Sequence, residues 1–559
     1  MKTKHILLGI VLLPILSCTL EKQKGISDDL IGVWSGILFQ TESRYDSIAI
    51  SLEEEQLFFY KNGTATNHPL EKRGNELSFK GQSGLRFDGT ILADNSLIGT
   101  LTEALWVQSL FFKPSMDRWV ATSTKPEIID TDYTLFLDFY KDSHGTLQAR
   151  IQSNKENRTL HFTIDSVLID DHQIDFKISN DRFGLSAQLE DHGNSIQLIY
   201  TNAGGPRHIE LKKLKKSEQS GYRPKLTASY QYEVPKASAA IQSASLEEVG
   251  INTSMLKLMD VINNGKYEHI HSIIITRKNK LVFEEYFHGY DRDYLHDIRS
   301  SFKSIASILY GKVDSAPAKH LNDAILDYYP DYDPSDVRKK NMTVHHALTM
   351  STGLLLEDED DMQWNNINWV DHKLGLPLEH VPGEHYEYSS GGTNLLTGVI
   401  QQRAGKYLPL YLYEEVLIPM DIHHFQMRVS PMNRAYLSGD FYLRPIDFTK
   451  FGLLVLNQGR FNEKQIVSAE WITQSTQPHI KGSYPKDTDY GYLWRLLKRE
   501  VNGRSISTIE AWGNGGQYLI IIPTLEMTIT FTGGNYNLFP EMEEVPFELL
   551  TNYIFPAVD

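Results

Sequence analysis

Hydrophobic residues alternate with polar ones in the first part of the chain and follow mixed periods in the last part. Between residues 27 and 215, short alternating runs recur, as in Asp46–Leu52 and Tyr133–Phe139. Turn signals such as Lys61-Asn62-Gly63 separate these runs, and alternation bounded by turns predicts strands. Long helical periodicity is absent from this part. We therefore predict an all-β, barrel- or sandwich-like N-terminal region.

A faint internal repeat divides this β region. The run Leu77–Lys80 has a counterpart at Ile174–Lys177, and later apolar runs match at a nearly constant offset. Self-similarity at a fixed offset indicates repeated structural units. We place one β-rich unit at residues 27–125 and a second at 126–215.

The pattern becomes mixed in the last half of the chain. Residues 216–245 show no clear period and are interpreted as a linker. Beyond them, Ile273–Thr276 and Leu281–Tyr286 predict a hairpin, and three more strands are predicted after a helix- and loop-rich middle. Strands at both ends favour one antiparallel sheet flanked by helices, with a helical subdomain inserted. The predicted fold class of residues 246–559 is therefore α/β (α+β).

One apolar stretch inside this domain has helical spacing. Phe302, Ile305, Ala306 and Leu309 fall at i, i+3, i+4 and i+7, which predicts one buried face of a helix. Gly311 is a plausible stop for that helix.

Ser300 and Lys303 stand at the start of the same stretch. Residues three apart are neighbours on a helix, so the hydroxyl and the amine would point the same way. A serine hydroxyl becomes a strong nucleophile only when a base removes its proton. The alternative is a helix-capping serine beside a solvated lysine, because S-x-x-K alone is a weak signal. The decision between the two rests on partners elsewhere in the chain.

Two later stretches supply such partners. The glycine-flanked loop Pro382–Gly392 carries Tyr388 and Ser390 and leads into a helical pattern. The glycine-rich stretch Ala511–Gln517 precedes an apolar strand, and glycines at a strand edge let another backbone approach closely.

In this order, the Ser300-x-x-Lys303 pair, the Tyr388-x-Ser390 loop and the glycine-rich strand resemble the serine β-lactamase and penicillin-binding-protein superfamily. The closest resemblance is to its class C-like branch, which includes esterases, D-amino-peptidases and 6-aminohexanoate-dimer hydrolases. It covers residues 246–559 and implies a β-lactamase/transpeptidase-like sheet with a helical subdomain.

The resemblance also implies roles for individual residues. Ser300 would be the acyl-forming nucleophile, Lys303 its proton acceptor and Tyr388 the partner base. The oxyanion hole would consist of the backbone N–H groups of Ser300 and Asn514. The implied substrate-binding residues are Ser390, Ala511, Trp512, Gly513 and Trp494.

Two departures from the superfamily pattern bear on the substrate. Ser390 stands where the penicillin-binding pattern has asparagine, and Ala511-Trp512-Gly513 stands where it has Lys-Thr-Gly. They favour small esters, amides or peptides over β-lactams. A true β-lactamase or D-Ala-D-Ala carboxypeptidase stays open, as does a non-catalytic binding or sensor protein that kept the fold. The sequence predicts no cofactor and no metal site.

The N-terminus has the features of an export signal. A basic start precedes the apolar run Ile6–Leu16, which is too short to span a membrane and typical of a secretory signal. Ile15–Cys18 resembles a bacterial lipobox, and Cys18 is the only cysteine in the chain. We predict a signal peptide at 1–17, a lipidated Cys18 and a tether at 18–26. A soluble secreted protein is the alternative.

Length and charge narrow the remaining possibilities. A chain of 559 residues is long enough for several domains. The formal net charge of −16 argues against a nucleic-acid partner. Every candidate catalytic position lies beyond residue 240, so the sequence predicts that a fragment starting there folds and keeps the site. The expected location is the cell envelope, with the protein anchored at a periplasmic or outer-membrane face.

Overall fold

A computed structural model describes most of the chain and divides it into two compact units, one of residues 1–42 with 129–226 and one of 43–128 with 227–559. No helix among the described residues has the length and apolarity needed to cross a membrane. The predicted signal peptide and Cys18 lie outside the described residues. The described residues are 28–40, 45–122, 132–153, 163–179, 183–190, 194–202, 205–221, 230–267, 269–314, 316–356, 368–483, 485–486, 488–501, 503–536 and 540–558.

The first unit is one antiparallel sheet around an apolar core. Its strand order is β12-β11-β1-β17-β16-β15-β14-β13. Alternate residues point inward, and the fully buried Trp34 of β1 packs among leucines and phenylalanines of the other strands. The strands are β1 (Gly32–Gln40), β11 (Asp132–Lys141), β12 (Leu147–Ser153), β13 (Ile164–Asp170), β14 (Gln173–Ile178), β15 (Gly184–Glu190), β16 (Ser195–Asn202) and β17 (Gly205–Lys213).

The position of β1 differs from the predicted division of the β region. Strand β1 pairs with β11 and β17, so Gly32 lies opposite Phe139 and Trp34 opposite Lys213. The first strand therefore belongs with the second group of strands, and the predicted boundaries 27–125 and 126–215 need correction at this point. Local periodicity identified the strand but could not identify its partners.

Residues 43–128 form a second curved sheet, which we call the inserted barrel because its sequence interrupts the first unit. Its strand order is β4-β3-β2-β10-β9-β8-β7-β6-β5, and Phe87, Leu101 and Phe112 are buried at its centre. The strands are β2 (Ser47–Ser51), β3 (Gln56–Lys61), β4 (Thr64–Pro69), β5 (Glu71–Arg73), β6 (Glu76–Lys80), β7 (Arg86–Ile91), β8 (Leu97–Glu103), β9 (Trp106–Ser115) and β10 (Arg118–Ala121).

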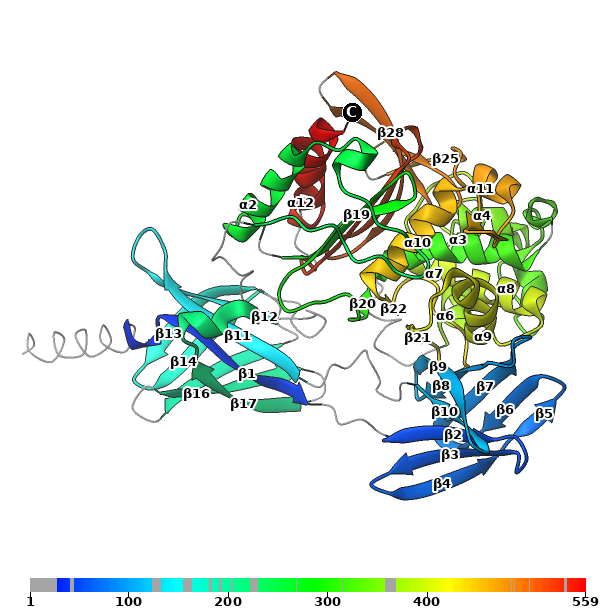
Figure 1. The fold of residues 1–559 in the computed structure, drawn as a ribbon, viewed down its shortest axis with the longest axis horizontal. Coiled ribbons are helices and arrows are strands. Elements are labelled where there is room, and N and C mark those ends of the chain that lie inside the picture. Colours follow the sequence, from blue (N-terminus) through cyan, green and yellow to red (C-terminus); the bar gives the residue numbers. More distant parts are fainter. Residues whose placement is uncertain are drawn as a thin grey trace, which may run out of the picture. The chain divides into compact units, whose positions relative to one another are not determined.

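The inserted barrel is joined by strand pairing to the C-terminal part of its unit (Figure 1). Strand β9 pairs with β21 (Gln426–Arg428), β21 with β22 (Phe441–Leu443), and β22 with β20 (His296–Asp297). Ile98 and Val107 of the barrel belong to the same apolar core as the Ser300 helix. The expectation that residues from 240 onward fold alone is therefore not supported by the structure, because such a fragment would expose these barrel contacts.

The C-terminal part is built on an antiparallel sheet with a core on each face. Along β29 and β18, Ile521 and Ile274 point into one core while Ile520 and Ile273 point into the other. These strands read as continuous apolar runs because both faces are covered. The strands in sheet order are β19 (Lys280–Tyr286), β18 (Ile270–Arg277), β30 (Met527–Gly533), β29 (Gln517–Ile522), β28 (Arg504–Gly513), β27 (Arg495–Val501), β26 (Thr488–Tyr490) and β25 (Ile480–Gly482), with a separate pair β23 (Arg460–Phe461) and β24 (Lys464–Gln465).

Helices cover both faces of this sheet. In Figure 1, α2 and α12 lie on one side, and α3 and α10 lie on the other with the helical subdomain. Two short 3-10 turns, Glu247–Val249 and Thr253–Leu256, lead into α2. The α-helices are α2 (Lys257–Asn263), α3 (Phe302–Val313), α4 (Val344–Leu348), α6 (Trp369–Gly375), α7 (Ser390–Asn394), α8 (Leu396–Ala404), α9 (Leu408–Leu412), α10 (Pro445–Leu456), α11 (Ala469–Ser475) and α12 (Glu541–Leu549).

Helix α3 is buried on every side over residues 302–311, more completely than its apolar spacing predicted. Gly311 does not stop the helix. A Cβ atom there would lie 1.9 Å from the Trp471 ring, so glycine allows the close approach of α11. The Trp471 indole N–H also donates to the carbonyl of Ser307 at 2.9 Å. The helix that follows the candidate nucleophile is thus held at the centre of the core.

Candidate active site

Ser300 lies in a 3-10 turn, Arg299–Ser301, immediately before α3. The Lys303 Nζ donates to Ser300 Oγ at 2.9 Å and to the carbonyl oxygen of Ser438 at 2.9 Å. The Lys303 side chain is almost completely buried, whereas Ser300 is partly exposed. The structure therefore joins the predicted nucleophile and its predicted base by a direct hydrogen bond.

The turn that carries Ser300 has an unusual backbone. Arg299 has φ of 51°, in the left-handed region that a non-glycine residue seldom adopts. Asp297 holds this conformation, because its carboxylate accepts the Arg299 N–H at 2.9 Å and pairs with the Arg299 guanidinium at 3.3 Å. Such a conformation persists only where the surroundings support it, and it is common at active sites.

Tyr388 lies beside Lys303, as predicted. The Lys303 Nζ is 4.8 Å from the centre of the Tyr388 ring. The guanidinium of Arg495, at the start of β27, is 5.3 Å from the same ring. Two cations within cation–π range of one half-buried ring make a strongly positive environment for the predicted partner base.

Ser438 and Asn394 support this arrangement, although sequence reasoning did not identify them. Ser438 Oγ donates to the Ser390 carbonyl at 2.8 Å, while its own carbonyl accepts from Lys303. Asn394 Oδ1 accepts the backbone N–H of Leu437 at 2.9 Å. Ser438 thereby connects the S-x-x-K helix to the Tyr-x-Ser loop. Neither residue belongs to a spacing pattern that the sequence could have revealed.

The glycine-rich strand end also meets the Ser300 turn. A Cβ atom on Gly513 would lie 2.4 Å from the Ile298 carbonyl oxygen, so only glycine allows this approach. Ser301 Oγ donates to the Gln517 carbonyl at 3.0 Å. Asn514 follows Gly513 at this end of β28, and its role in the oxyanion hole stays a prediction.

The predicted substrate-binding residues differ in exposure. Trp494 is completely buried, and its contact with substrate stays a prediction. Trp512 is 8% exposed, and its indole N–H donates to Glu510 at 2.7 Å. Arg495 lies over Trp512, 4.6 Å from the ring centre. The predicted substrate-binding residue Trp512 therefore has a guanidinium against its ring. Ser390 and Ala511 are also buried, and their contacts with substrate stay predictions.

Residues 271–541 match the family model described as Beta-lactamase. We call the matched residues the Beta-lactamase-family domain. The predicted superfamily and the predicted fold class are thereby confirmed, including the all-β N-terminal region with its nearly closed sheets.

Individual relatives of the Beta-lactamase-family domain are distant. The chain is 26% identical over 135 residues to Protein flp of Staphylococcus aureus (strain NCTC 8325 / PS 47), a match that covers 23% of this chain and 27% of that protein. A penicillin-binding protein homologue from Pyrococcus abyssi is 18% identical and covers 54% of this chain and 77% of its own, with a TM-score of 0.44. A family VIII carboxylesterase is 15% identical and covers 57% and 100%, with a TM-score of 0.44.

Two other tyrosines of the Beta-lactamase-family domain surround Arg495. Burial raises the pKa of Tyr386 to about 12, although the nearby guanidinium opposes the rise. Burial also raises the pKa of Tyr490 well above its ordinary value. Both phenols therefore hold their protons more tightly than an ordinary tyrosine does.

A buried histidine pair lies behind the Ser300 turn. His271 Nδ1 and His296 Nε2 are 2.8 Å apart, and His296 Nδ1 lies 3.0 Å from the Asp297 carbonyl oxygen. Burial lowers the pKa of His296 to about 4, so the pair is neutral at physiological pH. No group of three or more His, Cys, Asp or Glu in the described part of the chain has the arrangement of a metal site.

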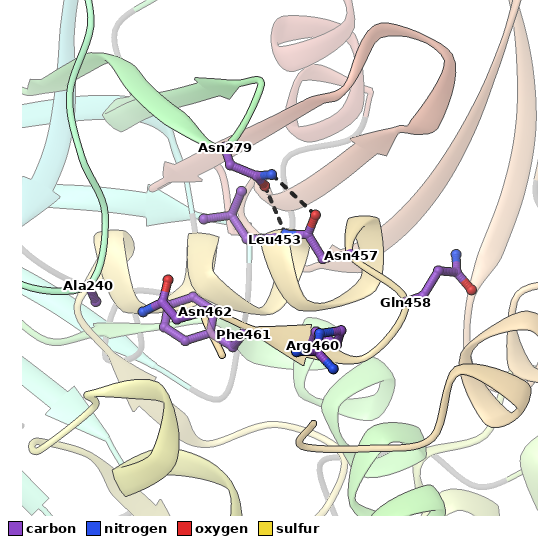
Figure 2. Close-up of a pocket in the computed structure, with 8 residues that line it drawn as sticks. All are labelled: Ala240, Asn279, Leu453, Asn457, Gln458, Arg460, Phe461 and Asn462. Carbon is purple, nitrogen blue, oxygen red and sulfur yellow. Dashed lines mark hydrogen bonds between the residues drawn. The ribbon is translucent and has the colours of Figure 1, made fainter. Parts of the chain in front are cut away.

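A cavity of about 460 Å³ opens elsewhere on the Beta-lactamase-family domain (Figure 2). Asn279 and Asn457 exchange two amide hydrogen bonds, of 3.2 and 2.8 Å, at its edge. Its lining comes from turns, from the end of α10 and from β23, and includes neither Ser300 nor Tyr388. We therefore do not assign this cavity to the predicted reaction.

Proposed function

We propose that this chain is a serine hydrolase that cleaves small esters or amides through an acyl-enzyme on Ser300. The observation that carries the proposal is the 2.9 Å hydrogen bond between the buried Lys303 Nζ and Ser300 Oγ. A lysine without a role in the site would keep its amine in water, because burying a charged amine costs free energy. The Lys303 amine is instead buried against the Ser438 carbonyl oxygen and Ser300. The Tyr388 ring beside the same amine supplies the second proton carrier.

The arrangement can carry out both halves of an acyl transfer. Ser300 Oγ attacks the substrate carbonyl carbon as its proton passes to the Lys303–Tyr388 pair. The backbone N–H groups of Ser300 and Asn514 would face the resulting oxyanion. Collapse breaks the bond to the alcohol or amine, which leaves with a proton relayed through Tyr388. Water, activated by the same pair, then cleaves the acyl-enzyme, releases the acid and returns the proton to Ser300.

A second candidate substrate class follows from Arg495. The absence of the Lys-Thr-Gly motif argues against substrates that carry a carboxylate, since a carboxylate losing its water needs a charged partner. Arg495 brings a guanidinium to within 4.6 Å of the Trp512 ring. A β-lactam or a peptide with a terminal carboxylate is therefore the alternative to an uncharged ester or amide.

A comparison of two chromogenic substrates tests the choice. We expect kcat/KM for a short-chain p-nitrophenyl ester to exceed that for nitrocefin by at least about tenfold, a difference of about 1.4 kcal/mol in transition-state stabilisation. Both values should be measured on one preparation, so that the active fraction cancels. A nitrocefin value above the ester value would favour the carboxylate-bearing class. In that case Arg495→Gln should lower the nitrocefin value selectively.

We also propose that the mature protein is anchored in the cell envelope through a lipidated Cys18. The support is the lipobox-like Ile15–Cys18 after a basic and apolar leader. Cys18→Ser should move the protein from the membrane fraction to the soluble fraction, because stable attachment depends on acyl chains. Alkaline washing followed by immunoblotting of both fractions measures the change. A mutant that still resists the wash would contradict the lipid anchor.

A further inference from the structure

We propose that the inserted barrel positions the catalytic serine, through strand β9 and with Trp106 as a positioning residue. The inference rests on the proposed function of Ser300 and adds a second part of the chain to the site. A path of paired strands and packed rings leads from β9 to the Ser300 turn, and each step lies within the second unit.

The first steps are strand pairings. Trp106 lies opposite Arg428, and Gln108 lies opposite Gln426, where β9 pairs with β21. The same Gln426 lies opposite Tyr442 of β22 on its other side. Tyr442 in turn lies opposite Asp297 of β20. A displacement of β9 would therefore be passed on through backbone hydrogen bonds to the residue that holds Arg299.

Side-chain contacts also stabilise the junction of β9 with β21 and β22. The Trp106 ring meets the Tyr442 ring edge-on, with 6.0 Å between centres. The Phe425 N–H donates to Ser109 Oγ at 3.0 Å, and the Ser109 N–H donates to the Phe425 carbonyl at 3.1 Å. Aromatic pairs of this geometry contribute beyond their buried area. The barrel is thus fixed to β21 and β22 by rings as well as by backbone hydrogen bonds.

The last steps reach the nucleophile. The Ile298 N–H donates to the Phe441 carbonyl at 3.0 Å. The Phe441 ring stacks on Phe302, the first residue of α3, with 4.1 Å between centres. Asp297 fixes Arg299 in its left-handed conformation. Ser300 therefore lies between Arg299, which Asp297 of β20 holds, and Phe302, which Phe441 of β22 holds.

A second contact patch between the barrel and its neighbour provides a matched control. Arg86 lies over the Tyr407 ring at 3.9 Å, and Thr102 shares a 3.1 Å hydrogen bond with the Tyr407 hydroxyl. These contacts lead to α9 and not to β20 or β22. A barrel that only stabilises its neighbour would act through both patches. A barrel that positions Ser300 would act through β9 alone.

The experiment compares Trp106→Ala with Arg86→Ala in the full-length protein. The readouts are the second-order rate of fluorophosphonate labelling, kcat and KM for the p-nitrophenyl ester, and the melting temperature. We expect Trp106→Ala to lower the labelling rate and kcat by about tenfold to a hundredfold with KM changed less than about threefold, because small displacements of a nucleophile cost that much. Trp106→Phe should restore most of the rate, and Arg86→Ala should lower only the melting temperature.

Equal rate losses in Trp106→Ala and Arg86→Ala, or a folded Trp106→Ala protein with unchanged kcat, would overturn the positioning role. A wild-type protein that reacts with neither probe nor ester would overturn the proposed hydrolase function instead. Hydrogen exchange then decides the positioning role separately: the amides of 297–301 should exchange faster in Trp106→Ala but not in Arg86→Ala. Unchanged exchange in both variants would reject it.

Discussion

Ser300→Ala should abolish fluorophosphonate labelling and ester turnover while leaving the melting temperature nearly unchanged. Only one hydroxyl is lost, and the Lys303 amine keeps its hydrogen bond to the Ser438 carbonyl. Lys303→Ala should reduce turnover by at least about 10²-fold, the usual cost of losing a general base. In-gel fluorescence and stopped assays on purified protein measure both effects.

Ser301→Ala is the matched control for Ser300→Ala. Its hydroxyl donates to the Gln517 carbonyl and not toward Lys303. It should keep labelling and lose about 1 kcal/mol of stability, the net value of one buried hydrogen bond. If Ser300→Ala is still labelled, the acyl-enzyme mechanism on Ser300 is rejected. A non-catalytic binding protein then becomes the better hypothesis.

A fragment of residues 230–559 should be insoluble or inert toward the probe. It lacks the strand that pairs with β21 and leaves an unpaired strand edge, which promotes aggregation. It also lacks Ile98 and Val107, two fully buried members of the core around α3. Removing buried aliphatic side chains of this size costs about 2–5 kcal/mol each, enough to remove most of the stability of a typical domain.

The informative control keeps the second unit whole. A chain in which residues 45–122 are joined to 230–559 by a flexible linker retains every contact between β9 and β21. That chain should be soluble and should react with the probe at a rate near that of the full-length protein. Solubility and labelling of the 230–559 fragment itself would contradict the prediction and would show that the barrel contacts are dispensable.

Local patterns predicted the elements better than their partners. The i, i+3, i+4 spacing identified α3, and alternation identified strands such as β2 and β11, because these signals depend on neighbouring residues. The pairing of β1 with β11 depends on residues far apart in sequence, and a two-residue period carries no information about which strand lies alongside. Gly311 shows the same limit, since its meaning depends on Trp471.

The site divides in the same way. Ser300, Lys303 and Tyr388 were predicted because their order and spacing are shared by a known superfamily, and the structure places Lys303 next to both of the others. Ser438 acts through its own backbone carbonyl, and the Asp297 carboxylate accepts the backbone N–H of Arg299, so no pattern of paired side chains signals either residue. The complete burial of Trp494 was likewise not predictable, because a motif does not report which way a side chain faces.

The inserted barrel interrupts the sequence of the first unit, and this constrains the order in which the two units can fold during synthesis. Strand β1 leaves the ribosome first, but its partners β11 and β17 follow only after the whole inserted barrel has been made. The barrel, whose strands are close in sequence, can fold while β1 is still unpaired. An exposed Trp34 strand must therefore be kept from wrong partners over that interval. Such an interval calls for chaperone protection until translation has passed residue 213.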